Sequence, residues 1–549
     1  MIPIDNVKNN LIRLFNFLPY NVGSVLKYSL IMIFNFIIFI SVKLSFIIHY
    51  LLSGVGISGK LVEIYIQPED SHKKVFNKIF HEIIKIIHEN DIEVFYLNNS
   101  ICLNILNKNE AVRLISKLKK DKSLWIRISS EYGTYDYRIC LIPNTLIYFL
   151  LMSSNSFILY KSIKSPDRRI VFGSESGCNI EIWINSDIHY KDKENYKRTV
   201  YKIASGDWLK EKNLLIEKGV VSNLALSPYK TDFPIDIVFT WVDGSDPEWQ
   251  NSFNTTIKKY KSNELLGAST NESRFRNFNE LKYSLRSICM YADFFNKIYI
   301  VTAGQVPEWL DTKNKRIEIV DHESIFPKGD YLPTFNSHAI ESRLHHIKEL
   351  SENYLYFNDD FLIGRPLTPS NFFLKKDISY FFATESTYIG LNNSNSKDLP
   401  VDSAAKNNRD IILSMYGSIV TNKFGHVPYP QLKSVLNEIE KNIPEILDKT
   451  ARSKFRNIND ISLPSSFYHH YAKLNGRAVP GNIKQTYIDI SNKNSLGHLK
   501  NLLNLDICNQ PQVFCINDVD YYDKDIAGFT EILQNTLESY FPIKSEFEK

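Results

Sequence analysis

Residues 235–247 read IDIVFTWVDGSDP, and this stretch decides the fold. The apolar residues Ile235, Ile237 and Phe239 recur at every second position, which predicts a β-strand. The last five residues, DGSDP, are turn formers that end the strand. In open α/β sheets, ligands bind beyond the carboxyl ends of strands, so Asp243 and its neighbours occupy a position suited to a ligand. Taken alone, such a turn is more often only a turn.

Segments with strand and helix patterns alternate after this stretch. Leu281, Leu285 and Ile288 mark one face of a helix, and a second helical run is expected over 340–350. Further strands are expected at 297–302, 317–320 and 354–357. The alternation predicts an α/β fold of Rossmann-like type, with a mostly parallel sheet covered on both faces.

Four sequence blocks follow one another between about residue 234 and residue 549. The first is IDIVFTWVDGSDP, and the second comprises RFRNFNELKYSLRSI, KIYIVTAGQVPEWL, FPKGDYLPTFNSHAIESRLHHI and YLYFNDDFLIG. The third is FGHVP with FRNIND, and the fourth is VFCINDVD with the tail ESYFPIKSEFEK. In this order the blocks resemble the Stealth family of sugar-phosphate transferases. That family includes bacterial capsular polysaccharide phosphotransferases and the catalytic subunit of the animal N-acetylglucosamine-1-phosphotransferase. Four ordered blocks are a far more specific signal than one short motif.

The resemblance implies transfer of a sugar-1-phosphate from a nucleotide diphosphate sugar, such as a UDP-linked sugar, to a hydroxyl of a glycan acceptor. The product would be a phosphodiester linkage in a capsular or cell-surface polysaccharide. Such a reaction requires attack at the phosphorus nearest the sugar, and it asks the protein mainly for positioning and charge neutralisation. Two alternatives stay open: a metal-dependent glycosyltransferase that attacks the anomeric carbon, and a carbohydrate-binding protein without catalysis.

Carboxylate and amide side chains recur at two places in the sequence. Asp359 and Asp360 follow a predicted strand, and Asn517 and Asp518 form a separate pair within the fourth block. Such hard oxygen ligands suit Mg²⁺ or Mn²⁺. We expect Asp360 and Asp518 to lead the coordination of this metal, with Asp359 and Asn517 in the same shell or one shell out. An isolated pair of Asp residues is often only a solvated turn, but here it falls within the second family block.

Catalytic roles are assigned to four residues. His426 lies in a loop stiffened by proline, and its imidazole is suited to take the proton of the acceptor hydroxyl; the resemblance also implies a catalytic role for it. Arg456 is expected to clamp the transferred phosphate. Glu341 is expected to orient His426 or the acceptor, and Asp359 completes the set. Two other histidine pairs are expected to have structural places. We expect His345 with His346 on a helix surface, and His469 with His470 in the core.

Binding of the donor is assigned to residues around the first two blocks. Arg274 and Arg276 flank Phe275, and a basic segment before a helix suits a diphosphate. The full set expected to bind substrate is Trp241, Asp243, Gly244, Arg274, Arg276, Asn279, Glu280 and Asn358. Basic residues beside an aromatic ring also suit nucleic acid. With 65 basic and 61 acidic residues, the net charge of +4 and the lack of a basic stripe argue against that partner.

Three segments are expected along the chain of 549 residues. They are an apolar, membrane-associating segment at 1–59, an α/β accessory domain at 60–232 and the catalytic domain at 233–549. The apolar segment contains an uncharged run between Lys27 and Lys43 that is shorter than the roughly 20 residues of a spanning helix. A tilted span, a helix in the lipid headgroup region and a buried core helix are all compatible with this pattern. We expect association with the cytoplasmic face of the inner membrane.

The composition indicates a globular protein of a reducing compartment. Hydrophobic residues make up 44% and charged residues 23% of the chain, as in globular proteins. The six cysteines form no CxxC pair, so neither a disulfide framework nor a zinc site is implied by their spacing. A bacterial cytosol, where nucleotide sugars are made, is the expected location of the catalytic domain.

Overall fold

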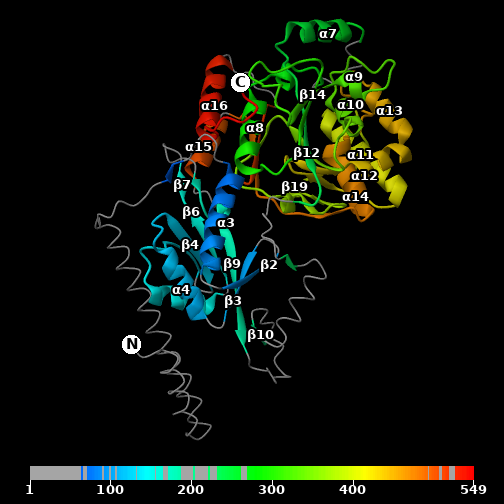
Figure 1. The fold of residues 1–549 in the computed structure, drawn as a ribbon. Coiled ribbons are helices and arrows are strands. Elements are labelled where there is room, and N and C mark those ends of the chain that lie inside the picture. Colours follow the sequence, from blue (N-terminus) through cyan, green and yellow to red (C-terminus); the bar gives the residue numbers. More distant parts are fainter. Residues whose placement is uncertain are drawn as a thin grey trace, which may run out of the picture.

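The structure is a computed structural model of the chain (Figure 1). It describes residues 64–65, 71–89, 92–97, 100–105, 108–130, 133–154, 156–164, 171–186, 202–204, 221–222, 231–260, 269–492, 494–505, 510–518 and 526–549. The predicted membrane-associating segment at 1–59, with its apolar helix, lies outside these residues and stays a prediction. No helix within the described part of the chain is long and apolar enough to cross a membrane.

A five-stranded sheet forms the centre of the C-terminal half, with strand order β14-β13-β12-β15-β21. The strands are β12 Ile235–Thr240, β13 Ile298–Thr302, β14 Ile317–Asp321, β15 Asn353–Asn358 and β21 Tyr429–Leu432. The first four in this order run parallel, and β21 runs antiparallel to β15 at one edge. The four strands predicted in this region are therefore confirmed within about one residue at each end. The mostly parallel sheet is confirmed too, with one antiparallel strand added.

Both faces of the central strands β12, β13 and β15 are buried, as expected for a sheet covered on both faces. Asp236 within β12 has no exposed surface. Its carboxylate accepts hydrogen bonds from Asn296 Nδ2 at 2.9 Å and from the backbone N–H of Ser351 at 2.7 Å. Since a buried carboxylate is tolerated only when it is paired, these two bonds explain its place in the core. They also fasten the loops that precede β13 and β15 to the start of β12.

The helix predicted at 281–288 is confirmed as α8 Glu280–Tyr291, but the helix predicted over 340–350 is wrong. In its place α10 Ser337–Glu341 ends early and is followed by the 3₁₀ turn η5 Leu344–His346. The hydroxyl of Ser342 donates to the carbonyl of Ala339 at 2.7 Å, a local bond that competes with helix continuation. Glu349 then adopts a left-handed conformation, with φ of 62°, and turns the chain into β15.

A small three-stranded sheet brings the end of the chain back to β15. Its order is β16-β24-β23, with β16 Phe361–Ile363, β24 Val513–Asn517 and β23 Gln485–Asp489. Because β16 starts directly after the Asp pair, its antiparallel pairing with β24 places the fourth family block beside that pair. The other strands here are β17 Phe373–Lys375, β18 Ile378–Phe381, β19 Ala383–Tyr388, β20 Asn422–Phe424 and β22 Ala478–Pro480. The other helices include α7 Pro247–Ile257, α9 His322–Ile325, α11 Pro400–Tyr416, α12 Lys433–Asn442, α13 Pro444–Arg452, α14 Tyr468–Leu474, α15 Ser495–Asn504 and α16 Ile526–Tyr540.

The N-terminal half is a second α/β unit built on an eight-stranded mixed sheet. Its order is β11-β2-β3-β9-β6-β4-β5, with β10 beside β9, and a separate three-stranded sheet holds β1, β7 and β8. The strands are β1 Ile64–Tyr65, β2 Glu93–Leu97, β3 Ser100–Ile105, β4 Leu124–Ser130, β5 Gly133–Arg138, β6 Ser156–Lys161, β7 Ile163–Lys164, β8 Val171–Phe172, β9 Cys178–Ser186, β10 Lys202–Ala204 and β11 Val221–Ser222. The helices are α3 His72–His88, α4 Lys108–Leu118 and α5 Asn144–Ser153. The α/β character expected for this region is confirmed, whereas its boundaries stay a prediction.

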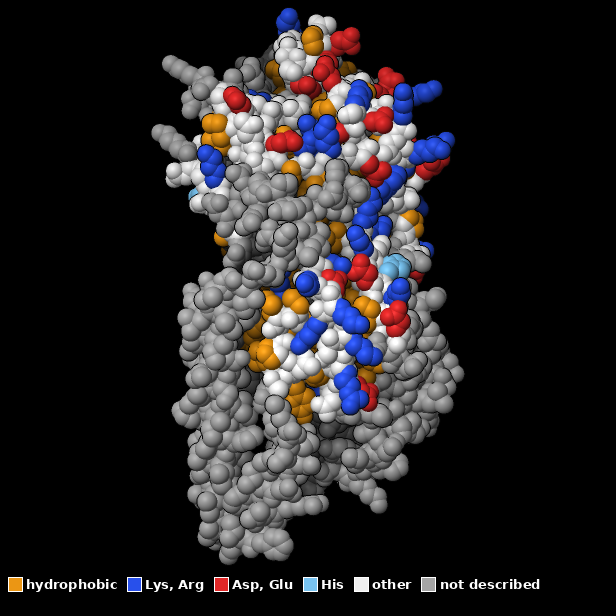
Figure 2. All heavy atoms as spheres, turned by 60° about the vertical axis from the view of Figure 1, so that its left-hand side comes forward, with side chains coloured by type: hydrophobic (Ala, Val, Ile, Leu, Met, Phe, Trp, Pro, Cys, Tyr) orange, Lys and Arg blue, Asp and Glu red, His pale blue; other side chains and the backbone are white. Residues whose placement is uncertain are grey.

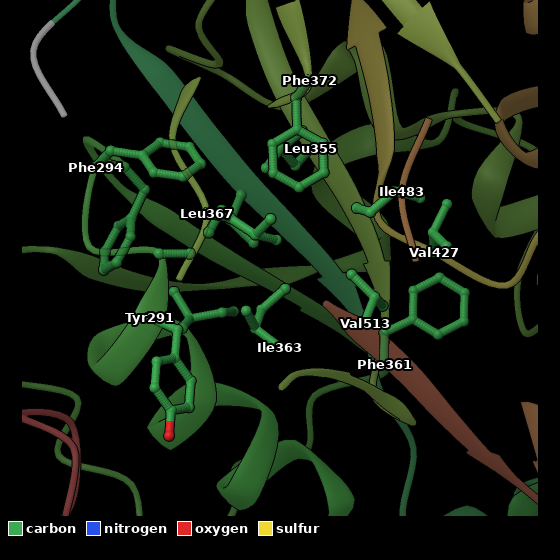
Figure 3. Packing of buried hydrophobic residues seen from close by; sticks show 14 of the residues in the cluster. Tyr291, Phe294, Leu355, Phe361, Ile363, Leu367, Phe372, Val427, Ile483 and Val513 are labelled. Carbon is green, nitrogen blue, oxygen red and sulfur yellow. The ribbon is translucent and has the colours of Figure 1, made fainter. Parts of the chain in front are cut away.

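The two halves meet where α3 of the N-terminal half approaches α8 of the C-terminal half (Figure 1). The rings of Phe172 and Tyr291 pack edge to face with centroids 5.9 Å apart, and Arg365 lies 3.5 Å from the Glu175 carboxylate. Within the C-terminal half, Phe361, Val427 and Val513 are fully buried in the core (Figure 3). Phe361 follows Asp360 and Val427 follows His426 in sequence, so the core fixes the backbone from which these two side chains start.

Candidate active site

The acidic pair Asp359-Asp360 follows β15 directly, at the edge of the sheet where β12 also ends. Thr240 and Asn358, the last residues of β12 and β15, lie opposite each other in the parallel register. The turn at 241–244 therefore starts beside the acidic pair. This is the edge at which the sequence predicts a ligand.

Two donors on one strand hold the carboxylate of Asp360. Its Oδ2 accepts a hydrogen bond from the Cys515 thiol at 3.2 Å and another from Asn517 Nδ2 at 3.1 Å. The other oxygen, Oδ1, is buried without a hydrogen-bond partner. Burial raises the pKa of Asp360 to about 6, although the two donors favour the ionised form. One oxygen is thus fixed in place and the other is left for a ligand.

Two further carboxyl groups crowd this position. Glu280, at the start of α8, is buried, and its Oε2 accepts from the Phe278 N–H at 2.7 Å. Burial and the nearby Asp359 carboxylate raise the pKa of Glu280 well above its ordinary value. Burial and the Asp360 carboxylate raise the pKa of Asp359 to about 7. Carboxyls that repel one another in this way, beside the unpartnered Asp360 oxygen, fit a divalent cation with oxygen ligands.

Asp518, a predicted leading metal ligand, forms an ion pair instead. Arg276 Nη1 lies 2.5 Å from Asp518 Oδ2, and the guanidinium carbon of Arg276 lies 5.9 Å from the centroid of the Phe278 ring. A metal ion at Asp518 would have to share this oxygen with a guanidinium. The metal role of Asp518 therefore stays a prediction. The contact between Asp518 and Arg276 joins residues 242 positions apart, so the sequence alone did not indicate it.

A second cluster is basic and gathers around Arg456. Its Nη2 donates to the Ser337 hydroxyl at 2.7 Å, while its Nε is buried without a partner. Burial lowers the pKa of Arg456. Burial and the charge of Arg456 lower the pKa of Arg274, in the 3₁₀ turn η4 Glu272–Phe275, to about 9. Two partly buried guanidinium groups that repel each other fit a bound anion such as a phosphate.

Glu341 and His338 belong to this basic cluster and lie three residues apart on α10. Tyr356 donates its hydroxyl hydrogen to Glu341 Oε1 at 3.1 Å, and Glu341 Oε2 is buried without a partner. Burial raises the pKa of Glu341 to about 7, against the opposing effect of Arg456. Burial and Arg456 lower the pKa of His338 to about 4, so this imidazole is neutral at neutral pH. Sequence reasoning missed His338, although its spacing from Glu341 places both on one helix face.

His426 lies beside the acidic cluster and is exposed, although its neighbours Gly425 and Val427 are buried. Its ring centroid is 4.8 Å from that of Tyr487 and 6.3 Å from that of Phe361, the residue after Asp360. Partial burial of the ring and the charge of Lys423 lower the pKa of His426. The imidazole is therefore neutral at neutral pH, the form that a general base needs.

Two glycines in the site lie close to neighbouring groups, and Gly244 is required because its neighbour is backbone, whereas Gly425 faces the flexible end of the Gln485 side chain. A Cβ atom on Gly244 would lie 2.5 Å from the Phe275 carbonyl oxygen, which accepts a hydrogen bond from the Gly244 N–H at 2.8 Å. A Cβ atom on Gly425 would lie 2.1 Å from Gln485 Nε2. The turn after β12 thus contacts the segment that carries Arg274 and Arg276, which joins the acidic cluster to the basic one.

The other residues predicted to bind substrate have local structural roles. Trp241 is buried in the core, with 8% of its surface exposed. Asp243 Oδ1 accepts hydrogen bonds from the Ser245 N–H at 2.9 Å and its hydroxyl at 2.6 Å, which closes the turn. Asn279 takes a left-handed conformation before α8, with φ of 66°, and Asn358 is half-buried at the end of β15. Contacts of these residues with substrate stay predictions.

The competing histidines divide as follows. His469 and His470 are buried, and their ring centroids lie 4.8 and 4.7 Å from that of Phe424, which agrees with the expected core packing. His345, expected on a helix surface, is buried in the turn η5 instead. The expectation was wrong because the helix that would have exposed it ends at Glu341.

Four family models match this chain in the order of its blocks. They are Stealth protein conserved region 1 at 233–261, region 2 at 274–381, region 3 at 425–473 and region 4 at 507–549. The chain belongs to the Stealth family. The resemblance seen in the sequence is thereby confirmed, and it covers the residues of both clusters.

The curated relatives of this Stealth protein include exopolysaccharide phosphotransferases. SCO6023 of Streptomyces coelicolor is 38% identical over 398 residues, which cover 70% of this chain and 66% of that protein. SCO2592 of the same organism is 36% identical over 411 residues, which cover 71% of this chain and 42% of that protein. The chain thus spans less than two thirds of these two relatives. CpsY of Mycobacterium tuberculosis is 36% identical over 393 residues, covering 69% of this chain and 70% of CpsY.

Similarity to solved structures is weaker. The crystal structure of the galactosyltransferase LgtC in complex with donor and acceptor sugar analogues is 14% identical, with a TM-score of 0.27. The match covers 56% of this chain and 96% of that one. A TM-score of this size gives no guide to the activity of the Stealth chain.

Proposed function

We propose that this Stealth protein transfers a sugar-1-phosphate from a nucleotide diphosphate sugar to a hydroxyl of a glycan, with Mg²⁺ or Mn²⁺ as cofactor. The product is a phosphodiester linkage in a cell-surface polysaccharide. The observation that carries the proposal is that one site contains both an acidic cluster and a basic cluster. Carboxyls at Asp359 and Asp360 suit a cation, and guanidinium groups at Arg274 and Arg456 suit a phosphate. The names of the relatives, exopolysaccharide phosphotransferases, support the same chemistry.

The residues around Asp360 fit the proposed cation. Asp360 Oδ1 is a buried oxygen without a partner, and Asp359 and Asn517 offer further oxygen ligands next to it. A bound cation would supply neutralisation of the charge on the diphosphate. Since the pKa values of Asp359 and Asp360 are raised, both carboxyls must lose protons to serve as ligands.

The basic cluster is suited to bind the phosphate that is transferred. Arg274 and Arg456 repel each other in the free protein, and a phosphate between them would relieve that repulsion. Arg456 Nε, buried and unpartnered, is one donor available for such an oxygen. The neutral ring of His338 beside them adds no further positive charge at neutral pH. Positioning of the phosphorus and neutralisation of its oxygens are what this reaction requires of a protein.

The acceptor is proposed to bind on the His426 side of the site. The neutral imidazole would take the proton of the attacking hydroxyl. Tyr487, whose ring packs against that of His426, keeps 45% of its surface exposed. An exposed aromatic ring beside the base is a suitable platform for the apolar face of a sugar. Attack at phosphorus leaves the anomeric C–O bond intact, so the anomeric configuration of the donor sugar is retained.

A panel of nucleotide diphosphate sugars tests the proposal with Mg²⁺ or Mn²⁺ and an oligosaccharide acceptor. Release of nucleoside monophosphate is the expected result. Release of nucleoside diphosphate would point to the glycosyltransferase alternative, and binding without turnover to the non-catalytic one. The Asp360→Asn variant serves as the blank, because it removes the charge of the proposed ligand while keeping its shape. Full turnover of the wild type in excess chelator would contradict the role of the cation.

Association with an anionic membrane surface at the cytoplasmic face is also proposed. It is supported by the apolar run in the sequence before residue 59 and by the charge of the N-terminal half. On the face of that half seen in Figure 2, the charged side chains are mostly basic. Exposed basic side chains on its helices include Lys74, Lys78, Lys85, Arg113 and Lys117. Such a surface gains from contact with anionic lipids, and the gain falls as salt is added. Flotation with anionic vesicles at low and high salt tests this point; equal binding to neutral vesicles would contradict it.

A further inference from the structure

A cluster of two histidines and one glutamate lies outside the site described above. His345 and His346 are in the turn η5, and Glu440 is on α12. His345 Nε2 lies 2.9 Å and His346 Nε2 lies 3.1 Å from the same oxygen, Glu440 Oε2. Among the described residues, ligand atoms of these three side chains all lie within 4.8 Å of one another.

These separations match those of a tetrahedral zinc site. Zinc binds imidazole nitrogen and carboxylate oxygen at about 2.0–2.2 Å, so two ligand atoms of one tetrahedron stand roughly 3.3 Å apart. The two nitrogen–oxygen separations at Glu440 Oε2, 2.9 and 3.1 Å, are close to this value. The third separation, between the ligand nitrogens of the two imidazoles, lies within 4.8 Å, so a cation that replaces the two hydrogen bonds draws these nitrogens toward the tetrahedral separation.

The surroundings leave one carboxylate oxygen and one open direction for a cation. Arg343 Nη1 donates to the other oxygen, Glu440 Oε1, at 2.6 Å and so orients the carboxylate. The side chain of His345 is fully buried, whereas that of His346 is 39% exposed, so water can reach the cluster from one side. The positive charge of Arg343 repels a bound cation. The affinity of the cluster for zinc should therefore be lower than that of closed structural zinc sites.

We propose that His345, His346 and Glu440 form a second metal site, which takes Zn²⁺ or a similar borderline cation with water as the fourth ligand. Two imidazoles and one carboxylate favour such ions over Mg²⁺, which prefers oxygen ligands. The site is independent of the transfer reaction proposed above. Its metal would tie η5, which follows Glu341 closely in the chain, to α12.

The test uses the full chain, stripped of metal with chelator and titrated with Zn²⁺ against a chromophoric chelator. It is run in the Asp360→Asn background, so that the proposed oxygen site contributes as little as possible. His346→Ala removes a half-exposed ligand, and Glu440→Gln keeps the shape of the side chain. His498→Ala, which removes an exposed histidine on α15, is the matched control.

The expected result is about one Zn²⁺ per chain. His346→Ala and Glu440→Gln should each weaken Zn²⁺ binding by at least roughly tenfold, since each removes a direct ligand. The melting temperature of the parent protein should rise by about 2 °C or more with saturating Zn²⁺, and chelator should reverse the rise. The His498→Ala control should behave like the parent. The proposal is overturned if the parent takes up no Zn²⁺, or if His346→Ala and Glu440→Gln both titrate like the parent. No readout depends on transfer activity, so either proposal can fail without the other.

Discussion

Asn517 donates a hydrogen bond from Nδ2 to Oδ2 of Asp360 over 3.1 Å, across 157 residues of sequence. The pairing of β16 with β24 makes this contact possible, because Phe361 lies opposite Cys515 in the ladder. The second and fourth family blocks therefore build one site. The bond also explains why one oxygen of Asp360 is fixed while the other stays without a partner.

Cys515 should act as a positioning residue for Asp360. Cys515→Ala removes one of the two donors to Oδ2, and we expect the Mn²⁺ concentration for half-maximal activity to rise roughly tenfold, as is typical when the partner of a ligand is lost. Cys515→Ser keeps a donor and should recover most of that loss. Steady-state rates over a range of Mn²⁺ concentrations measure both. Equal Mn²⁺ dependence in wild type and Cys515→Ala would show that the thiol does not position the carboxylate.

His426→Ala should lower the maximal rate by roughly 10² or more, because the proposed general base is lost. The Michaelis constant for the donor should barely change, since the imidazole is proposed to contact the acceptor. Initial rates at saturating and limiting donor separate the two quantities, with His498→Ala as a control. A variant that turns over normally at saturation but binds donor poorly would assign His426 to donor binding instead.

Glu341 should make the protein less stable as the pH rises. Its pKa is raised from 4.5 to about 7 in the folded protein, so the folded state keeps a proton that the unfolded chain has lost within this pH window. Stability is unaffected by this group below pH 4.5 and falls as the pH rises toward 7, by about 3 kcal/mol at most. Glu341→Gln removes this effect.

The difference in melting temperature between Glu341→Gln and wild type, measured at pH 5 and at pH 8, tests this expectation. The melting temperature of Glu341→Gln relative to that of the wild type should be higher at pH 8 than at pH 5. Glu323→Gln, a change at an exposed carboxylate, should show no such gain and serves as the control. A constant difference at both pH values would mean that Glu341 is already ionised at pH 5.

The C-terminal tail should contribute to folding through Arg286. This side chain is 1% exposed and makes two hydrogen bonds to the Glu548 carboxylate, at 2.7 and 2.8 Å. Glu548→Ala leaves the buried guanidinium with the half-exposed Glu538 as its remaining carboxylate and should cost about 3 kcal/mol of unfolding free energy. Glu546→Ala, which removes one of the two carboxylate partners of the more exposed Arg316, should cost about 1 kcal/mol or less. Chemical denaturation compares the two variants, and equal losses would contradict the role of the buried pair.

Local patterns were enough to predict the four parallel strands of the central sheet but not its antiparallel edge strand β21. Each of its four parallel strands is a short apolar run bounded by turn residues, and those signals lie within a few neighbouring positions. The helix expected over 340–350 failed because a side-chain hydrogen bond at Ser342 and the left-handed Glu349 break it. The spacing of apolar residues does not reveal the Ser342 hydrogen bond or the left-handed conformation of Glu349.

Residues of the site were predictable where they sit at strand ends, and much less so where partners come from distant segments. Asp359 and Asp360 lie at the end of a strand that the sequence predicts, and they lie beside the turn at 241–244 because parallel strands end at one edge. The ion pair of Arg276 with Asp518 and the thiol contact of Cys515 depend on strand pairings that no local pattern contains. Cys515 does share a strand face with Asn517, two residues away, which was the one available signal.

The fate of the phosphate nearest the sugar tests the proposed reaction most directly. The enzyme, with Mg²⁺ or Mn²⁺ and an acceptor, would receive a nucleotide diphosphate sugar labelled with ³²P in that phosphate alone. Phosphate transfer predicts that the label enters the glycan as a phosphodiester while unlabelled nucleoside monophosphate is released, and that Asp360→Asn abolishes both. Label found in a released nucleoside diphosphate, with a glycan free of ³²P, would contradict the account.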